Sequence, residues 1–234
     1  MESRIRNLVV DTLFPRFCAS CRCEGSLMCA PCQTSWSLRP LEPACAFCRK
    51  TGSNVTCHAC RSSTFLDGLI AFGPYANPVV RTMLRSWKYI GDRSAEPMLQ
   101  QWLFRDADRL HPPLHPFFVV PIPLHEKRER ERGFNQADVL AQWIEQMYGL
   151  PVLSLIRRSV HTQPQAHVTG RERRLGELDA IFSLNPLFVE DGVPAYVLLC
   201  DDVFTSGATM DAAAELLKNH GAKQVWGFVI AKGA

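Results

Sequence analysis

The sequence lacks long hydrophobic runs and carries little net charge. No segment of the 234 residues approaches the roughly 18 consecutive apolar residues that a membrane-spanning helix requires. The N-terminal residues lead into only a short apolar patch, which Asp11 interrupts, so the pattern does not predict a signal peptide. The formal charge is only +3, although 20 of the 26 basic residues are arginine and gather in a few segments. We therefore expect a soluble, cytoplasmic protein without membrane insertion.

Cysteine is almost absent from most of the chain. Nine of the ten cysteines fall between Cys18 and Cys60, and the tenth, Cys200, lies in a predicted buried strand. This asymmetry indicates an N-terminal module, residues 1–64, with a short helix expected at residues 3–13. The module has little apolar core of its own, so bound metal must hold it folded. A larger domain, residues 65–234, should contain most of the hydrophobic core.

The cysteines form four pairs, each with two residues between its members. Four such pairs combine naturally into two tetrahedral sites with four thiolates each, and zinc is the expected metal. Because these sites leave no coordination position open, the two zinc ions should be structural. Disulfides are the competing interpretation, but the odd number of cysteines in the segment and the repeated spacing count against them. Cys23 is spare, and His58 is an alternative ligand. The predicted metal ligands are Cys18, Cys21, Cys29, Cys32, Cys45, Cys48, Cys57 and Cys60.

After the cysteines, strand and helix patterns alternate, which predicts an α/β domain with a parallel sheet flanked by helices. The expected strands are residues 69–72, 117–122, 196–200 and 225–231, with a possible strand at 152–156. The expected helices are residues 79–89, 96–110, 135–148 and 211–218.

The most informative segment is Tyr196–Thr209, where an apolar run ends in two acids and a small, hydroxyl-rich turn. The acids should lie at the carboxyl end of a buried parallel strand, where α/β sheets bind ligands, and the turn should hold a phosphate at a helix N-terminus. Vicinal ribose hydroxyls would donate to the acids. The alternative is an ordinary strand, turn and helix with two capping aspartates. The predicted sugar-phosphate residues are Asp201, Asp202, Thr205, Ser206, Gly207, Ala208 and Thr209.

A cationic segment follows the strand predicted at 117–122, so it should lie at the same edge of the sheet. It could hold a pyrophosphate group, and Asn135 should cap the helix that follows. The interleaved glutamates favour the alternative of a helical turn with internal salt bridges. The predicted pyrophosphate ligands are Lys127, Arg128, Arg130 and Arg132.

A second basic segment, residues 157–174, is poorly periodic and is predicted to be a flexible loop. It is interpreted either as a lid over a phosphorylated sugar or as a contact surface for a nucleic-acid backbone. An ordinary surface loop is equally compatible with the pattern. The basic residues of this loop are Arg157, Arg158, Arg171, Arg173 and Arg174.

Val197–Thr209 resembles the motif by which type I phosphoribosyltransferases bind phosphoribosyl pyrophosphate (PRPP), with Phe204 where the family usually has a smaller aliphatic residue. The order of the motifs along residues 13–232 resembles the ComF/GntX family. That order is a double cysteine ribbon, a Val-Pro-Ile-Pro-Leu-His segment with Arg-Gly-Phe-Asn-Gln after it, a Thr-Gln-Pro-Gln loop and the PRPP motif. The sequence departs from this pattern at residues 176–182. The resemblance therefore does not predict whether the loop closes over the ligand.

The resemblance implies a type I phosphoribosyltransferase-like fold that binds PRPP with Mg²⁺ and a role in natural transformation. Single-stranded DNA and recombination or DNA-uptake proteins are the implied partners. The alternative is an active phosphoribosyltransferase of nucleotide metabolism, whose acceptor and catalytic residues the sequence does not identify. An amidophosphoribosyltransferase activity is not expected, because Met1–Arg16 has no cysteine to serve as a glutaminase nucleophile.

Overall fold

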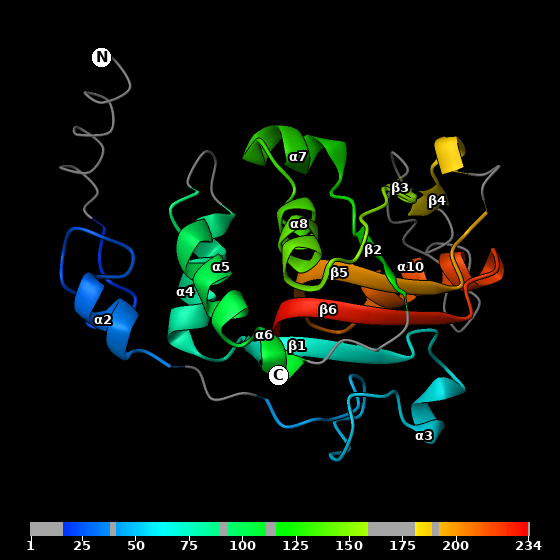
Figure 1. Ribbon diagram of the computed structural model, residues 1–234, viewed down its shortest axis with the longest axis horizontal. Coiled ribbons are helices and arrows are strands. Elements are labelled where there is room, and N and C mark those ends of the chain that lie inside the picture. The colour runs from blue at the N-terminus through cyan, green and yellow to red at the C-terminus, as the bar shows by residue number, and fades with distance from the viewer. Residues whose placement is uncertain are drawn as a thin grey trace, which may run out of the picture.

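A four-stranded parallel sheet forms the centre of the computed structural model (Figure 1). The structure describes residues 16–37, 41–88, 93–110, 116–158, 181–188 and 192–233. The strand order is β1-β6-β5-β2, so the last two strands in sequence are central. The strands are β1 (Gly68–Pro74), β2 (Phe118–Pro121), β5 (Tyr196–Phe204) and β6 (Gln224–Lys232). The predicted parallel α/β architecture is confirmed.

Strand β5 is buried on both faces of the sheet. Leu198 and Cys200 contact the hydrophobic cluster on one face, and Val197 and Leu199 contact the cluster on the other. Successive side chains of a strand point in opposite directions, so a strand covered on both faces must be apolar at every position. This explains why the run before the two acids has no polar alternation.

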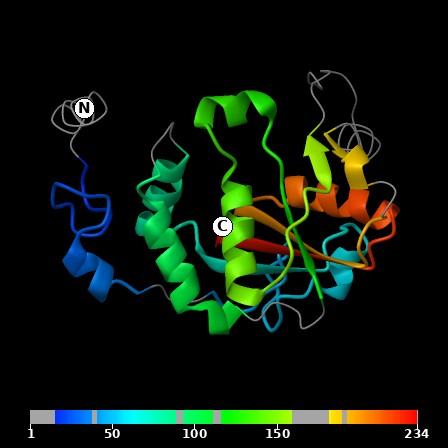
Figure 2. The ribbon, with the colours of Figure 1, turned by 45° about the horizontal axis from the view of Figure 1, so that its top comes forward.

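Helices cover both faces, with α8 in front of the sheet and α10 behind it in the view of Figure 2. The helices on the first face are α4 (Pro78–Trp87), α5 (Glu96–Arg105), α6 (Ala107–Leu110) and α8 (Gln136–Tyr148), and α10 (Ala208–Asn219) lies on the second. The Asn135 side chain accepts a hydrogen bond from the Ala137 amide, which confirms the predicted cap of α8. In the described residues, no helix has the length and apolar character needed to cross a bilayer.

Two predicted elements differ in the structure. The single helix expected at residues 96–110 is interrupted at Asp106, whose φ of −105° and ψ of 14° leave the helical region. The strand expected at residues 152–156 makes only an isolated parallel bridge between Val152 and Val119. The chain then leaves the sheet, and Leu155 is buried in the core cluster on the α10 face. Residues Ile156–Arg158 (β3) instead pair antiparallel with Phe182–Leu184 (β4).

Gly68 lies at a close approach between neighbouring strands. A Cβ atom there would lie 2.6–2.7 Å from three atoms of the Trp226 ring, on the strand that pairs with β1. We expect Gly68→Ala to lower the free energy of unfolding by about 1–3 kcal/mol, since a rigid ring in the sheet cannot move aside without distortion. Urea denaturation measures this. In a Trp226→Leu background the cost should fall by at least half, and an equal cost in both backgrounds would contradict the explanation.

Candidate functional site

The two acids lie where the central strand extends beyond one of its neighbours. Strand β2 ends at Pro121, which pairs with Cys200, whereas β5 continues to Phe204 and stays paired with β6. The strand is therefore four residues longer than predicted, and the acids lie within its final segment. Because β2 is absent there, one side of this segment is open at the carboxyl edge of the sheet, where parallel sheets bind ligands.

Asp201 and Asp202 have different surroundings. Asp202 is 7% exposed, and its Oδ2 lies 2.6 Å from Lys88 Nζ. Within the described residues this oxygen has no well-aligned hydrogen-bond donor. Asp201 is half-buried, and its Oδ1 accepts the backbone N–H of Asp202 at 2.7 Å. Burial and then the charge of Asp202 raise the pKa of Asp201 to about 7, against the opposing effects of that N–H and of Lys88.

Lys88 is a site residue that the sequence analysis did not predict. It follows the last residue of α4, and its ammonium pairs with Asp202 at the end of β5. The Gln136 side chain holds this helix end by donating to the Trp87 carbonyl at 3.1 Å, and the Trp87 ring stacks on Trp143 with centroids 5.4 Å apart. In sequence, a lone lysine at a helix C-terminus indicates only a favourable interaction with the helix dipole. No local signal therefore connects Lys88 with Asp202.

The turn after β5 encloses a small hollow with Asp201 at its rim. The hollow has a volume of about 40 Å³ and is lined by Asp201 and residues 203–210. Gly207 has a φ of 82° and is the N-cap of α10. The Ala208 amide donates to Ser206 Oγ over a long distance of 3.4 Å. Thr205, Ser206, Ala208 and Thr209 are exposed. The predicted phosphate residues thus lie together at a twelve-residue helix N-terminus, beside one of the acids.

The predicted pyrophosphate ligands form a short exposed helix, α7 (Glu126–Arg132). Arg130 pairs with Glu126 at 3.4 Å, one turn away, as the alternative interpretation of a salt-bridged turn expected. Arg132 donates to Gln136 Oε1 at 3.0 Å, which links α7 to the residue that holds α4. The four cations are therefore not equivalent, because two of them already have side-chain partners.

Arg158 joins the site from β3. Its guanidinium lies over the Phe182 ring at 5.6 Å from the centroid. Burial lowers the pKa of Arg158, the charge of Arg128 lowers it further, and the charge of Asp201 opposes both effects. Arg158 is thus half-buried and feels the charges of Arg128 and Asp201, whereas Arg157 is exposed. The other predicted loop cations, Arg171, Arg173 and Arg174, lie outside the described residues.

The eight predicted metal ligands form two groups. Cys18, Cys21, Cys29 and Cys32 make one group, and Cys45, Cys48, Cys57 and Cys60 make the other, with all ligand atoms in a group within 4.8 Å of one another. Each group therefore combines two consecutive cysteine pairs. Neither group includes a histidine. Cys23 is not a member, although Cys21 Sγ lies 3.3 Å from its sulfur.

Both groups contain the same backbone turn. After the first pair of each group, an arginine has a positive φ, 67° at Arg22 and 63° at Arg49, and a glycine three residues later has a φ of 116°. In each group the amide of the third cysteine also lies near the sulfur of the first, with Cys29 N 3.5 Å from Cys18 Sγ and Cys57 N 3.4 Å from Cys45 Sγ. The doubled pattern in the sequence is therefore a structural repeat.

The chemistry of the sulfur atoms fits a dication. Burial raises the pKa of Cys18 and Cys45, but backbone N–H groups outweigh this effect and bring both pKa values to about 6. Crowding by neighbouring thiols acts in the other direction on Cys60, raising its pKa to about 12, with the hydrogen bond to Cys48 as the largest cause. Four thiolates at this distance repel one another unless a cation lies between them, and Zn²⁺ meets this requirement.

The two cysteine groups pack against different faces of the domain. Cys18 and Met28 belong to the core cluster that contains α4, α5 and α8, and Trp36 stacks on Trp102 with centroids 4.1 Å apart. Ala46 belongs to the cluster on the α10 face. Trp36 and Phe47 thus each pack on an aromatic ring of the larger domain.

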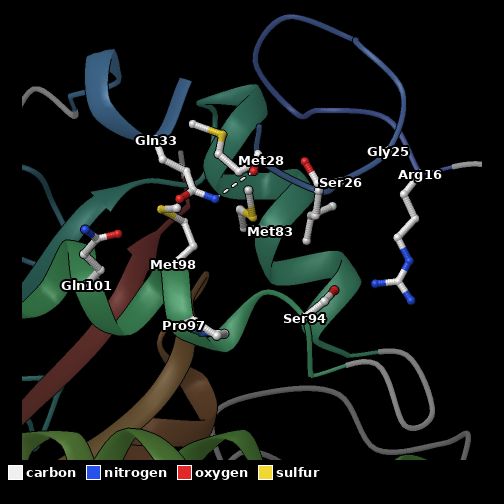
Figure 3. A pocket seen from close by; sticks show the side chains of 11 residues that line it. Arg16, Gly25, Ser26, Met28, Gln33, Met83, Ser94, Pro97, Met98 and Gln101 are labelled. Atoms are coloured by element: carbon white, nitrogen blue, oxygen red, sulfur yellow. Dashed lines mark hydrogen bonds between the residues drawn. The ribbon is translucent and has the colours of Figure 1, made fainter. Parts of the chain in front are cut away.

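A larger pocket of about 410 Å³ lies between the first cysteine group and helices α4 and α5 (Figure 3). Three methionines converge on it, Met28, Met83 and Met98, and Gln33 donates to the Met28 carbonyl at 2.8 Å. Its lining shares no residue with the hollow at the phosphate turn. The pocket therefore lies at the interface between the cysteine module and the helices.

We expect purified protein to contain two equivalents of zinc, because two closed groups of four thiols are present. Mass spectrometry of the native protein or metal analysis measures this. Cys45→Ser with Cys48→Ser should reduce the content to about one equivalent. Cys23→Ser is the matched control, and a loss of zinc in that variant would show that the ligand set is wrong.

Comparison with known proteins agrees with this arrangement. Residues 190–233 match the family model of the phosphoribosyl transferase domain. Competence protein F of Haemophilus influenzae is 29% identical over 88% of this chain and 93% of its own length. Competence protein ComFC of Bacillus subtilis is 27% identical over 83% and 90%, and DNA utilization protein YhgH of Escherichia coli K12 is 27% identical over 91% and 96%. The chain thus has two four-cysteine groups ahead of a segment similar to the phosphoribosyl transferase domain, and it is similar along most of its length to competence proteins F and ComFC.

Proposed function

We propose that this protein binds PRPP with Mg²⁺ at the turn after β5 and acts in DNA uptake, where it handles incoming single-stranded DNA. One observation carries the ligand assignment: a carboxylate and an uncapped helix N-terminus line the same hollow. Vicinal hydroxyls would donate hydrogen bonds to the carboxylate, and a phosphate would accept them from the amides of the helix N-terminus. A ribose 5-phosphate carries both groups on one small molecule.

Each part of the ligand has a group of matching charge. The ribose hydroxyls would donate to Asp201, and the 5-phosphate would accept from the amides at residues 205–209. The pyrophosphate, with its Mg²⁺, would face the cations of α7 and Arg158, because Arg158 responds to both Arg128 and Asp201. Lys88 compensates the buried charge of Asp202, so that the acid pair can lie beside an anionic ligand.

The role in DNA uptake rests on the relatives, which are named for competence and DNA utilization. Arg157 is exposed next to Arg158, so a nucleic-acid strand could follow the basic segment outward from the ligand. Handling of single-stranded DNA and binding of PRPP are compatible, since Arg158 is half-buried and feels the charge of Asp201, whereas the neighbouring Arg157 is exposed.

An active phosphoribosyltransferase of nucleotide metabolism is the second candidate. It would need a group to activate an acceptor, and His125 is the histidine nearest to α7. Its Nδ1 already accepts the Lys127 amide at 3.2 Å, which commits one ring nitrogen to capping the helix. Pyrophosphate release during incubation of the protein with PRPP and candidate acceptors would favour this function over ligand binding alone.

Calorimetric titration with PRPP and Mg²⁺ tests the ligand assignment. We expect Asp201→Asn to weaken binding by about tenfold or more, since it removes charge-assisted hydrogen bonds to the hydroxyls. A neutral pair, Lys88→Met with Asp202→Asn, tests the compensated acid without leaving a lone buried charge. Absence of binding to the wild type, or unchanged affinity in folded Asp201→Asn protein, would contradict the assignment.

The pH dependence of PRPP affinity provides a further prediction. The ligand hydroxyls select the ionised form of Asp201, whose pKa in the free protein is about 7. Affinity should therefore rise as the pH increases through 7, and below 7 it should fall by up to about tenfold per pH unit. The Asp201→Asn variant is the control for titration of the ligand's own phosphates. The same pH slope in both proteins would show that Asp201 does not titrate with binding.

Binding of single-stranded DNA should depend on salt and on the basic segment. We expect Arg157→Gln to reduce the slope of log affinity against log salt by about 0.7, the value for one phosphate contact on a single strand. Arg81→Gln, an equally exposed change on α4, is the matched control and should leave the slope unchanged. Equal slopes for both variants and the wild type would place the DNA contact elsewhere.

A further inference from the structure

The second cysteine group contacts the phosphate turn directly. Phe47 lies between the ligands Cys45 and Cys48, and its ring meets the Phe204 ring edge-on with centroids 5.9 Å apart and planes at 72°. Both rings also lie against Gly207. A Cβ atom at that position would collide with the Phe204 ring and would lie 3.0 Å from Phe47 Cε1. The metal-binding turn and the start of α10 therefore share one packed contact.

Two polar contacts fix the same neighbours. The Lys232 side chain donates to the Cys45 carbonyl at 3.3 Å, and Lys232 is paired with Phe204 between β6 and β5. Gly233 N donates to the Phe204 carbonyl at 2.7 Å. These bonds hold the end of β5 next to the cysteine turn.

The chain that leaves the second group is tied to the first turn of α10. Asp211 Oδ1 accepts the amides of Phe65 and Leu66 at 2.7 and 3.0 Å, and Thr56 Oγ1 donates to the Leu66 carbonyl at 2.5 Å. The helix whose N-terminus lines the hollow thus begins against the segment that contains the second group.

The ligand side of the turn has little support of its own. Thr205, Ser206, Ala208 and Thr209 are exposed, whereas Phe204 and Gly207 are buried on the side of Phe47. The first cysteine group has no comparable relation to the turn among the described residues, because it packs on α4 and α5 through Met28 and Trp36. Support from a metal site therefore comes from the second group alone.

We propose that the second cysteine group forms the rear wall of the phosphate site, with Phe47 and Phe204 as positioning residues that couple bound metal to the conformation of the turn. The identity of the ligand rests on the proposed function, whereas the coupling itself does not. Coupling is reciprocal, so a ligand at the turn must protect the second group against loss of metal.

Hydrogen exchange of residues 203–209 is the first test, and it requires no ligand. In zinc-loaded Phe47→Ala protein we expect at least tenfold faster exchange at this turn and at least tenfold weaker PRPP binding, with zinc content still two equivalents. Trp36→Ala is the matched control, since it removes a ring beside the first group and should change neither value. Wild-type exchange and affinity in Phe47→Ala protein would overturn the proposal.

Phe204→Leu removes the same contact from the side of the sheet, away from the cysteines, and is informative if Phe47→Ala loses zinc. The double variant should be no worse than the more affected single variant, because both remove one contact. Additive effects of the two substitutions on exchange would show that the rings act independently and would overturn the coupling.

Metal release provides the reciprocal test. Zinc is removed with a chelator while alkylation of each cysteine is followed by mass spectrometry. PRPP should slow alkylation of Cys45 and its group several-fold in the wild type without protecting the group of Cys18, and Phe47→Ala should abolish this protection. Equal protection of both groups would overturn the proposal. If wild-type protein fails to bind PRPP, the proposed function fails, and the exchange comparison still decides whether the turn depends on Phe47.

Discussion

Two neighbouring carboxylates at the end of a buried strand are the constraint on which the rest of the site depends. Asp201 and Asp202 are adjacent at the end of β5. Their mutual repulsion and their burial are unfavourable without nearby cations. The protein supplies Lys88 at Asp202 and places Arg158 within the field of Asp201. These cations come from α4 and β3, so the acids are compensated only when distant parts of the domain have folded around β5.

The same constraint explains the polar connections around the site. Gln136 holds the end of α4 from which Lys88 projects, and it also accepts a hydrogen bond from Arg132 on α7. One glutamine thus connects α7 with the end of α4. The stacked Trp87 and Trp143 rings make this connection part of the hydrophobic core.

The cysteine groups share one local structure and have different surroundings. Each repeats the turn with a left-handed arginine and a glycine, but one lies on the face of α5 and the other on the face of α10. The first group stabilises the helical layer through Trp36 and Trp102. The second lies next to the turn that forms the candidate phosphate site, so a metal held by this group would lie beside that turn.

The sequence by itself determined the features that depend on residues close together in the chain. The cysteine spacings identified the eight ligands, although only the tertiary structure divided them into two groups. The apolar run before Asp201 determined a strand buried on both faces, and Asn135 determined the start of α8. Each follows from local geometry. This is the two-residue spacing of a cysteine pair, the alternation of side chains along a strand, or the unpaired backbone amides in the first turn of a helix.

Only the tertiary structure decided which distant residues meet. The strand order β1-β6-β5-β2 brings Lys88 to Asp202 across more than a hundred residues, and it brings Phe47 to Phe204 across still more. The residues predicted as strand 152–156 make a single bridge to the sheet edge at Val152, and Leu155 is buried in the core on the α10 face. Such contacts depend on how the layers stack and on which edge of the sheet is open, and neither quantity is encoded in the spacing of neighbouring residues.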